Sequence, residues 1–267
     1  MRVRIIFSLK NKGADVPFHH QYLLAQIIKG LIVKGGDQSF LTCGSYNFSG
    51  LKGQTKVSRS GLHFYSSKVT LVVSTPDPNF ISYLLKYLFE MPQIEVGNLI
   101  LIPQEVEEEE EPIFEDFMKF VCISPLVLVE ASFDEEESKQ YISPETDFFS
   151  DKLYDLTMSR MEKSGCSPDQ IASFFKFQLV PDKDYLLKIK QGKKKFARIY
   201  PVYDQDVKYE IRGYTFPFTL FAAAEVLEFI YTCGFGFYTE KGFGMLDTVM
   251  ENQEKRTHPY EIVNIPN

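Results

Sequence analysis

The order in which strands and helices are predicted over residues 1–112 restricts the fold more than any other feature of this sequence. Apolar and polar residues alternate over 2–9, which predicts a half-buried strand, and an amphipathic stripe over 18–36 predicts a helix. The order strand, helix, strand, strand, helix, strand is that of a ferredoxin-like unit, in which two helices cover one face of a four-stranded sheet. Its predicted strands are 2–9, 45–51, 61–74 and 94–106, and its predicted helices are 18–36 and 77–91, the latter capped by Asp77 with Pro78 at its first position.

A second unit of comparable order is predicted after the glutamate run at 105–112, which we interpret as a linker or an exposed strand end. The sequence therefore predicts an α+β protein with tandem ferredoxin-like (βαββαβ) domains at 1–112 and 113–250, followed by a C-terminal tail at 251–267. The predicted elements of the second unit are a strand at 117–131, a helix from Thr146, a hairpin over 184–214 with its turn at Gln191 and Gly192, a helix at 217–234 that starts at Pro217, and a strand at 244–251.

Charge is segregated along the chain, although the net charge is −7. Residues 1–60 carry nine Lys or Arg and two Asp, whereas residues 105–155 carry seventeen Asp or Glu and three Lys. The stretch from Lys188 to Arg212 again has an excess of bases, eight against three acids. This pattern favours two basic surfaces separated by an acidic, solvated connector, although solvated faces without a partner would give the same pattern.

Several classes of protein are disfavoured by the composition. The four cysteines lie far apart and form no C-x-x-C pair, which speaks against a zinc site or a disulfide framework and fits a reducing cytoplasm. The N-terminus reads as a strand and not as a signal peptide, and Glu225 and Glu228 interrupt the longest apolar run, so no membrane span is expected. We predict a cytoplasmic protein with no metal site and no cofactor.

The stretch GFGFYTEKGFGML at 234–246 packs four glycines into thirteen residues. A Walker loop requires a strand, then G-x-x-x-x-G-K-[ST], then a helix, but here the order is helix, loop, strand, and no Ser or Thr follows Lys241. A dinucleotide fingerprint fails on the same order. The remaining readings are an ordinary turn and a loop whose bare backbone amides approach a phosphodiester.

The pattern Gly234-Phe235-Gly236, five residues, Gly242-Phe243-Gly244 resembles the glycine-rich loop of the Cas6 family, the CRISPR-associated endoribonucleases that cleave repeat RNA. Three further segments agree: VPFHHQYLLAQIIKGLI resembles the first helix of that family, YNFSGL the following strand, and VCISPLVLV the Ser-Pro strand that opens the second half. The resemblance implies tandem ferredoxin-like domains and binding of CRISPR repeat RNA. It also implies cleavage without a metal, in which a ribose 2′-hydroxyl attacks the adjacent phosphate and leaves a cyclic phosphate and a 5′-hydroxyl.

The catalytic residues that the resemblance implies depart from the commoner family pattern. Family members often have a Tyr late in the first helix and a His in the segment after it, but here the helix position is Lys29 and no His lies between His20 and His63. A lysine-based variant of the family uses one lysine on the first helix and another just after the second strand, and Lys29 and Lys52 match those places. His63 is the next candidate, and a surface lysine with no catalytic role is the competing interpretation of Lys29.

Basic residues and the glycine-rich loop are the expected RNA contacts. The predicted RNA-binding residues are Arg2, Arg4, Lys193, Lys194, Lys195, Arg198, Gly234, Gly236, Lys241, Gly242 and Gly244. Two alternatives stay open: a member that binds repeat RNA without cutting it, and a structural backbone subunit of a CRISPR effector complex. Such a complex and a homodimer are further candidate partners.

Overall fold

The computed structural model describes residues 1–41, 45–128, 142–204, 207–249 and 256–262 of the chain, so Cys43 and the last residues of the predicted strand at 117–131 lie outside the described residues. The chain divides into two units, each described below by itself. The first comprises Met1–Glu111, Glu240–Gly242 and the described part of Gln253–Asn267, and the second comprises Pro112–Thr239 and the described part of Phe243–Asn252.

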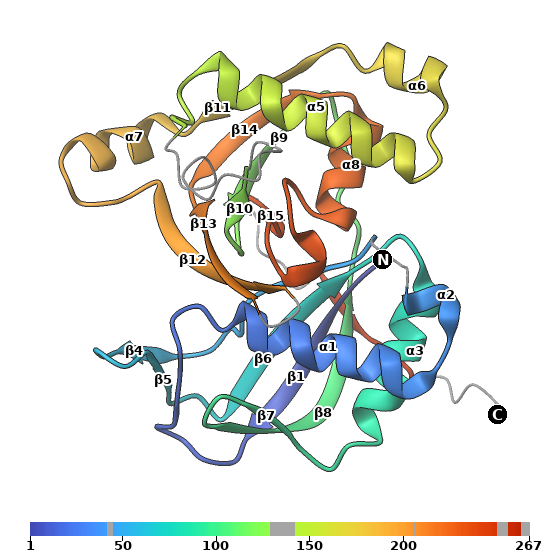
Figure 1. Cartoon of the computed structure of the whole chain (residues 1–267), viewed down its shortest axis with the longest axis vertical. Helices are drawn as coiled ribbons and strands as arrows, with labels where there is room; N and C mark the ends of the chain where they lie inside the picture. Colours follow the sequence, from blue (N-terminus) through green and yellow to red (C-terminus); the bar gives the residue numbers. More distant parts are fainter. Residues whose placement is uncertain (42–44, 129–141, 205–206, 250–255, 263–267) are drawn as a thin grey trace. The chain divides into compact units, whose positions relative to one another are not determined.

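The first unit is built on an antiparallel sheet with the strand order β16-β8-β1-β6-β3, in which β7 also pairs with β8. Figure 1 shows β6, β1 and β8 side by side in this sheet. The order β8-β1-β6-β3 is that of the ferredoxin-like fold, and β16, from the predicted C-terminal tail, lengthens the sheet at the β8 edge. The elements are β1 (Arg2–Leu9), α1 (Gln21–Gly35), α2 (Gln38–Leu41), β3 (Asn47–Phe48), β6 (Lys68–Ser74), α3 (Pro78–Phe89), β7 (Ile94–Val96), β8 (Leu99–Glu109) and β16 (Thr257–Pro259), with a small separate sheet of β2 (Asp15–Val16), β5 (Leu62–Phe64) and β4 (Thr55–Val57).

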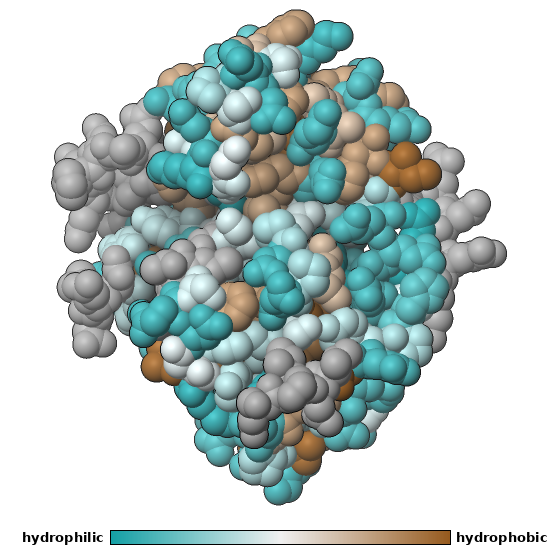
Figure 2. Space-filling view, turned by 90° about the vertical axis from the view of Figure 1, so that its right-hand side faces the viewer, coloured by the Kyte–Doolittle hydropathy of each residue, from teal (hydrophilic) through white to brown (hydrophobic). Residues whose placement is uncertain are grey.

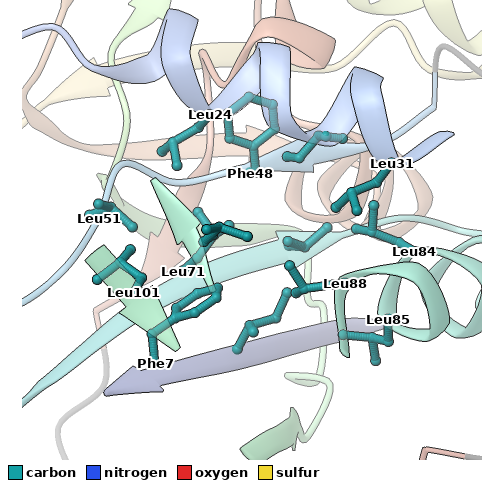
Figure 3. Close-up of a cluster of buried hydrophobic side chains, with 14 of the residues drawn as sticks. Phe7, Leu24, Leu31, Phe48, Leu51, Leu71, Leu84, Leu85, Leu88 and Leu101 are labelled. Carbon is teal, nitrogen blue, oxygen red and sulfur yellow. The ribbon is translucent and has the colours of Figure 1, made fainter. Parts of the chain in front are cut away.

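Helices α1 and α3 cover one face of this sheet and enclose its core. Leu31 from α1 lies beside Leu84 from α3, and Leu24 from α1 lies beside Phe48 of β3 in the same buried cluster (Figure 3). The predicted start of α3 is confirmed, because the Asp77 carboxylate accepts a hydrogen bond from the Asn79 backbone N–H at 2.9 Å. The alternating apolar residues of β1 and the apolar stripe of α1 therefore pack into the same hydrophobic core.

The second unit repeats the topology in a four-stranded antiparallel sheet of order β11-β14-β9-β15. Helices α5 and α8 pack on one face of it, and a second sheet of order β10-β13-β12 is added. The elements are β9 (Phe117–Cys122), β10 (Leu126–Val127), α5 (Asp147–Lys163), α6 (Pro168–Ser173), β11 (Phe177–Pro181), α7 (Lys183–Lys190), β12 (Ala197–Asp204), β13 (Val207–Tyr214), β14 (Pro217–Ala222), α8 (Ala224–Cys233), a short 3-10 turn η1 (Thr239–Lys241) and β15 (Leu246–Thr248).

The predicted hairpin over 184–214 is partly wrong. Its first half is the helix α7, which begins after Asp182, whose carboxylate accepts a hydrogen bond from the Tyr185 backbone N–H. The hairpin is formed instead by β12 and β13, and Gln191 is the C-terminal cap of α7. Lys193, Lys194 and Lys195 consequently lie in the loop between α7 and β12 and not at a hairpin turn.

Four other predicted elements are each two elements in the structure. The predicted strand at 61–74 contains β5 and β6, which belong to different sheets, and the predicted strand at 94–106 contains β7 and β8, which turn back on each other. The predicted strand at 117–131 contains β9 and β10, which belong to different sheets. The predicted helix at 217–234 begins as the strand β14, whose Phe218, Leu220 and Ala222 alternate inward, and only then continues as α8. Pro217 therefore starts a strand and not a helix.

The glutamate run is a paired strand and not a solvated connector. β8 extends to Glu109 and lies between β1 and β16, with Arg4 opposite Glu107 in the register. Glu109 is only 7% exposed, and its two carboxylate oxygens lie 2.9 Å from Nε of Arg2 and 2.5 Å from Nε of Arg4. Two bases of the N-terminal strand thus share one buried glutamate of the acidic run within one sheet.

On the face shown in Figure 2, hydrophilic residues cover most of the lower part, moderately hydrophobic residues gather in the upper part, and strongly hydrophobic residues stand singly. Such isolated apolar residues are normal for a protein surface in water. No helix in the described ranges is both long and apolar enough to cross a bilayer.

Candidate functional site

Lys29 lies on the solvent face of α1. The buried residues of this helix are Leu24, Ile28 and Leu31 among others, whereas Lys29 is exposed together with Gln26. The side chain is therefore available to a ligand, and it has the long flexible stem that lets a lysine reach an anion from the surface.

Lys52 is fixed by its backbone shortly after β3. Its N–H donates to the Thr70 carbonyl oxygen at 2.8 Å, and its own carbonyl oxygen accepts from the Thr70 N–H at 2.9 Å. The preceding residue, Leu51, donates its N–H to Nε2 of His20 at 3.0 Å. The start of α1 and the segment that carries Lys52 are thus joined through one imidazole.

His20 is a structural residue, and its protonation state follows from its contacts. Nδ1 lies 3.2 Å from the Pro17 carbonyl oxygen, so Nδ1–H donates there while Nε2 accepts from Leu51. Burial lowers the pKa of His20 to about 4, the backbone hydrogen bond to Pro17 acts in the opposite direction, and His19 lowers the pKa further. The neutral ring is the form that can accept the Leu51 hydrogen bond, so His20 holds the segment of Lys52 in place without titrating near neutral pH.

Lys29 and the segment that carries Lys52 lie at different positions along the axis of α1. The helix rises about 1.5 Å per residue, so Lys29 lies roughly 13 Å along the axis from His20, next to which the Lys52 segment is held. Each lysine carries its ammonium group on a flexible four-carbon stem, which extends its reach beyond the position of its backbone.

His63 is engaged in the small sheet of the first unit. Its Nδ1 lies 2.8 Å from the Gly13 carbonyl oxygen and its Nε2 lies 3.0 Å from the Ser58 hydroxyl. Both ring nitrogens therefore have partners that tie β5 to two neighbouring turns. A role as a general base requires that one of these hydrogen bonds be broken first.

The glycines of the 234–246 stretch are required by close packing. Gly236 has φ +94°, and a Cβ there would collide with the Val127 carbonyl oxygen. Gly244 has φ +72°, and a Cβ there would collide with the Phe235 carbonyl oxygen. Phe235 and Phe243 between the glycines are buried, so this pattern builds a loop folded onto its own core.

Arg160 of α5 holds this loop, and sequence reasoning missed it. Its NH1 donates to the carbonyl oxygens of Gly234 at 2.7 Å and Gly236 at 3.3 Å. Its NH2 donates to the Cys233 carbonyl oxygen at 2.7 Å and to the Thr239 hydroxyl at 3.2 Å. The guanidinium thus binds four acceptors of one loop, 73 to 79 residues away along the chain. A helical arginine three residues before the end of α5 gives no sequence signal of such a contact.

The loop between α7 and β12 forms one side of a basic groove of about 570 Å³. Four bases line this basic groove, and of the described residues that line it none is acidic. Its lining residues are Tyr185, Gly192, Lys193, Lys194, Lys195, Phe196, Arg198, Tyr200 and Thr215. The Tyr185 hydroxyl lies 3.0 Å from the Thr215 carbonyl oxygen and 3.2 Å from that of Lys195, which anchors the lysine loop. A chain of net charge −7 therefore has a local site suited to a phosphate-bearing ligand.

Arg2 and Arg4 occupy a different place from the one expected for RNA contacts. Arg2 is 2% exposed and its guanidinium is paired with Glu109, so it belongs to the interior of the sheet. Arg4 is partly exposed but shares the same carboxylate. Lys241 is half-buried in η1, and Gly242 lies against the Phe48 ring within the first unit.

Comparison with known proteins settles the family. Residues 107–248 match the protein family described as CRISPR associated protein Cas6, C-terminal. The chain belongs to this Cas6 family. The match begins in the glutamate run, ends with β15, and includes the basic groove and the glycine-rich loop.

Two curated Cas6 proteins resemble the chain over almost its whole length. It is 22% identical over 262 residues to the putative CRISPR-associated endoribonuclease-like protein Cas6 of Pyrococcus furiosus, covering 94% of this chain and 100% of that protein. It is 24% identical over 263 residues to CRISPR-associated endoribonuclease Cas6 1 of Methanocaldococcus jannaschii, covering 96% of this chain and 95% of that protein.

Solved Cas6-type structures share the fold. One, described as the characterization of a Cas6-related gene from Pyrococcus furiosus, superposes with a TM-score of 0.77 at 20% identity, covering 94% of this chain and 99% of that one. Another, described as a RAMP protein binding different RNA substrates, gives a TM-score of 0.76 at 19% identity, covering 94% and 100%. The predicted tandem ferredoxin-like fold and the resemblance to Cas6 are confirmed.

Proposed function

We propose that this Cas6-family protein binds CRISPR repeat RNA and cuts it, with Lys29 and Lys52 acting on the scissile phosphate. The observation that carries the binding part is the basic groove, because four bases converge there in a chain of net charge −7, inside the region that matches the family. Phosphate contacts of this kind supply most of the affinity of proteins for RNA and make it depend on salt.

The chemistry follows from the residue types. The 2′-hydroxyl of the ribose attacks the adjacent phosphorus, a P–O bond to the 5′-oxygen of the next nucleotide breaks, and that oxygen takes up a proton. A lysine is ordinarily protonated at neutral pH, so Lys29 and Lys52 can stabilise the charge of the transition state or protonate the leaving oxygen. Proton removal from the nucleophile is left to solvent, and correct in-line placement of the RNA then contributes much of the rate.

The binding part is tested by replacing Lys193, Lys194 and Lys195 with alanine. Affinity for the repeat RNA encoded beside this gene should fall, and the slope of log Kd against log salt should decrease by about two, roughly 0.7 for each phosphate that is no longer neutralised. The matched control replaces Lys183, Lys188 and Lys190, three lysines of the neighbouring helix α7 that do not line the basic groove. An equal change of slope in both triple variants would contradict a specific role for the groove.

The cleavage part is tested with the wild-type protein and a matched pair of substrates. A repeat RNA with a single 2′-deoxy sugar at the cut site should bind as the natural RNA does and stay intact, because its nucleophile is missing. Cleavage of the natural RNA should continue in EDTA and yield a cyclic phosphate. Tight binding of the repeat with no cleavage would identify a non-catalytic member, and light scattering would show whether it works as a homodimer or within an effector complex.

A further inference from the structure

The sheet face of the second unit that α5 and α8 leave uncovered carries two exposed phenylalanines. Phe117 on β9 and Phe221 on β14 are direct cross-strand partners, 47% and 43% exposed. Their ring centroids lie 5.7 Å apart and their planes differ by 29°, which is a stacked arrangement. The alternating residues Phe120 and Leu220 point to the opposite, helix-covered face and are buried.

The nearest residues of this face within the sheet are neutral or basic. Gln178 lies beside Phe221 on β11, and the next row of the same face holds Val180, Thr219 and Lys119. Acidic residues lie farther out, since Asp147 and Asp151 of α5 line a pocket with Phe221 and Gln178, and Asp247 of β15 lies opposite Val121. A negatively charged backbone is therefore favoured on the Lys119 side of the pair and disfavoured on the β11 side.

We propose that Phe117 and Phe221 are a stacking platform for two unpaired bases of an RNA strand, with Lys119 as the contact to its phosphate. This inference rests on the proposed function, since it adds a subsite to an RNA-binding protein. The strands β9 and β14 are the two central strands of a four-stranded βαββαβ sheet. In RNA-recognition motifs, which have the same sheet, aromatic side chains stack two or three bases.

The size of the patch favours bases over a protein partner. Two phenylalanines of this exposure offer roughly 200 Å² of surface together, since a whole aromatic side chain offers about 150–250 Å². A stable protein interface buries about 800 Å² on each partner. Gln178, Thr219 and Lys119 place polar groups beside the two rings, although Val180 adds apolar area to the same row.

The test uses the full chain and single-stranded octanucleotides of A or of U, with binding measured by fluorescence anisotropy. Phe117→Leu and Phe221→Leu should each weaken binding about fivefold or more, because stacking is lost while an apolar side chain remains. Phe117→Tyr should bind as the wild type does. The matched control is Phe148→Leu, since Phe148 is 48% exposed but lies on α5. Thermal unfolding of each variant separates loss of binding from loss of the fold.

Salt dependence distinguishes the rings from the lysine. The leucine variants should leave the slope of log Kd against log salt unchanged, whereas Lys119→Met should reduce it by roughly 0.7, the share of one phosphate contact. Wild-type affinity for both octanucleotides in the Phe117→Leu, Phe221→Leu double variant would overturn the inference, and repeat binding and cleavage would then remain intact. A change of oligomeric state in the double variant with unchanged RNA affinity would also overturn it, by assigning the pair to a protein interface. If the wild type failed to bind repeat RNA, the proposed function would fail, and the octanucleotides would still decide on the platform.

Discussion

The two units share one order of strands but place their polar residues differently. In the first unit, charged groups enter the sheet itself, where Arg2 and Arg4 surround Glu109 between β1 and β8. In the second unit the four-stranded sheet has an apolar, aromatic core, and bases gather in the segments added to it, such as the loop between α7 and β12. The same topology thus occurs in a unit that pairs charges inside its sheet and in a unit that gathers bases in the segments added to its sheet.

The units also hold their functional segments by different means. A backbone bridge to Thr70 and the ring of His20 fix the Lys52 segment of the first unit. The guanidinium of Arg160 fixes the glycine-rich loop of the second. Four substitutions test this contrast. Each removes a buried charge partner, a side chain that fixes a segment, or a candidate catalytic lysine.

Removal of the shared carboxylate should have the largest effect on stability. Glu109→Ala removes the buried carboxylate that both Arg2 and Arg4 contact, and loss of one member of a buried ion pair costs about 3–5 kcal/mol. Urea unfolding measures the loss, and hydrogen exchange should show faster exchange in β1 and β8. The control is Glu105→Ala, whose partner Lys68 is exposed, and it should change stability far less. Equal effects would show that the charges of the first sheet are all solvated.

His20 should make the stability of the first unit fall at acidic pH. Its pKa of about 4 lies below the ordinary value of 6.5, so the unfolded chain binds the extra proton first. The contribution is complete above pH 6.5 and is lost as the pH falls towards 4, by an amount on the order of 3 kcal/mol. Unfolding followed between pH 4 and 7 checks this. His20→Gln should flatten the profile over that window.

Lys29 should affect the rate of cleavage and leave the fold unchanged. Lys29→Ala should slow single-turnover cleavage of the repeat by roughly 10²-fold, about 2.7 kcal/mol of barrier, the scale for one electrostatic or acid–base group. RNA affinity should change little, and Lys52→Ala should show a smaller loss of rate. Lys34→Ala, on the same helix but paired with Glu90, is the control. If Lys29→Ala cleaves at the wild-type rate, Lys29 is not catalytic, and His63 becomes the next candidate catalytic residue.

Arg160 should show the smallest of the four effects, confined to the second unit. Arg160→Lys keeps the charge but removes the planar fork that donates to four acceptors, at a cost of about 2 kcal/mol in stability. Hydrogen exchange should rise in 234–246, and repeat RNA should bind more weakly. The reverse exchange Lys163→Arg, at an exposed position of the same helix, should change neither. Unchanged exchange in the loop would show that its glycine packing alone fixes it.

Helix starts could be predicted from the sequence, because they depend on interactions between residues that are close along the chain. The Asp77 cap with Pro78, and the Thr146 start of α5, depend on neighbours within a few residues. The helix α7 escapes prediction although Asp182 supplies the same kind of cap, because Gln191-Gly192 resembles a hairpin turn. The predicted helix at 217–234 includes β14 because the alanines that follow it favour helices and mask the alternation from Phe218 to Ala222.

The contacts of the candidate site could not be predicted, because they join distant parts of the chain. Leu51 lies 31 residues from His20, Gly234 lies 74 residues from Arg160, and Glu109 lies 105 residues from Arg4. No local pattern of residue types marks such pairs. The family resemblance indicated which segments matter, and only the three-dimensional arrangement shows that His20 and Arg160 hold them.

The strand β16 has a consequence for how the protein is made. It completes the sheet of the first unit at β8, and 148 residues separate Glu110 from its partner His258. At about 5–20 residues per second, a ribosome needs roughly 7–30 s to supply that last strand after β8 has emerged. Throughout this interval the nascent β8 has an open edge that could pair with another chain, and its row of glutamates is the kind of charged edge that discourages such pairing. The acidic run whose Glu109 pairs with Arg2 and Arg4 in the folded sheet would also keep the growing polypeptide from aggregating.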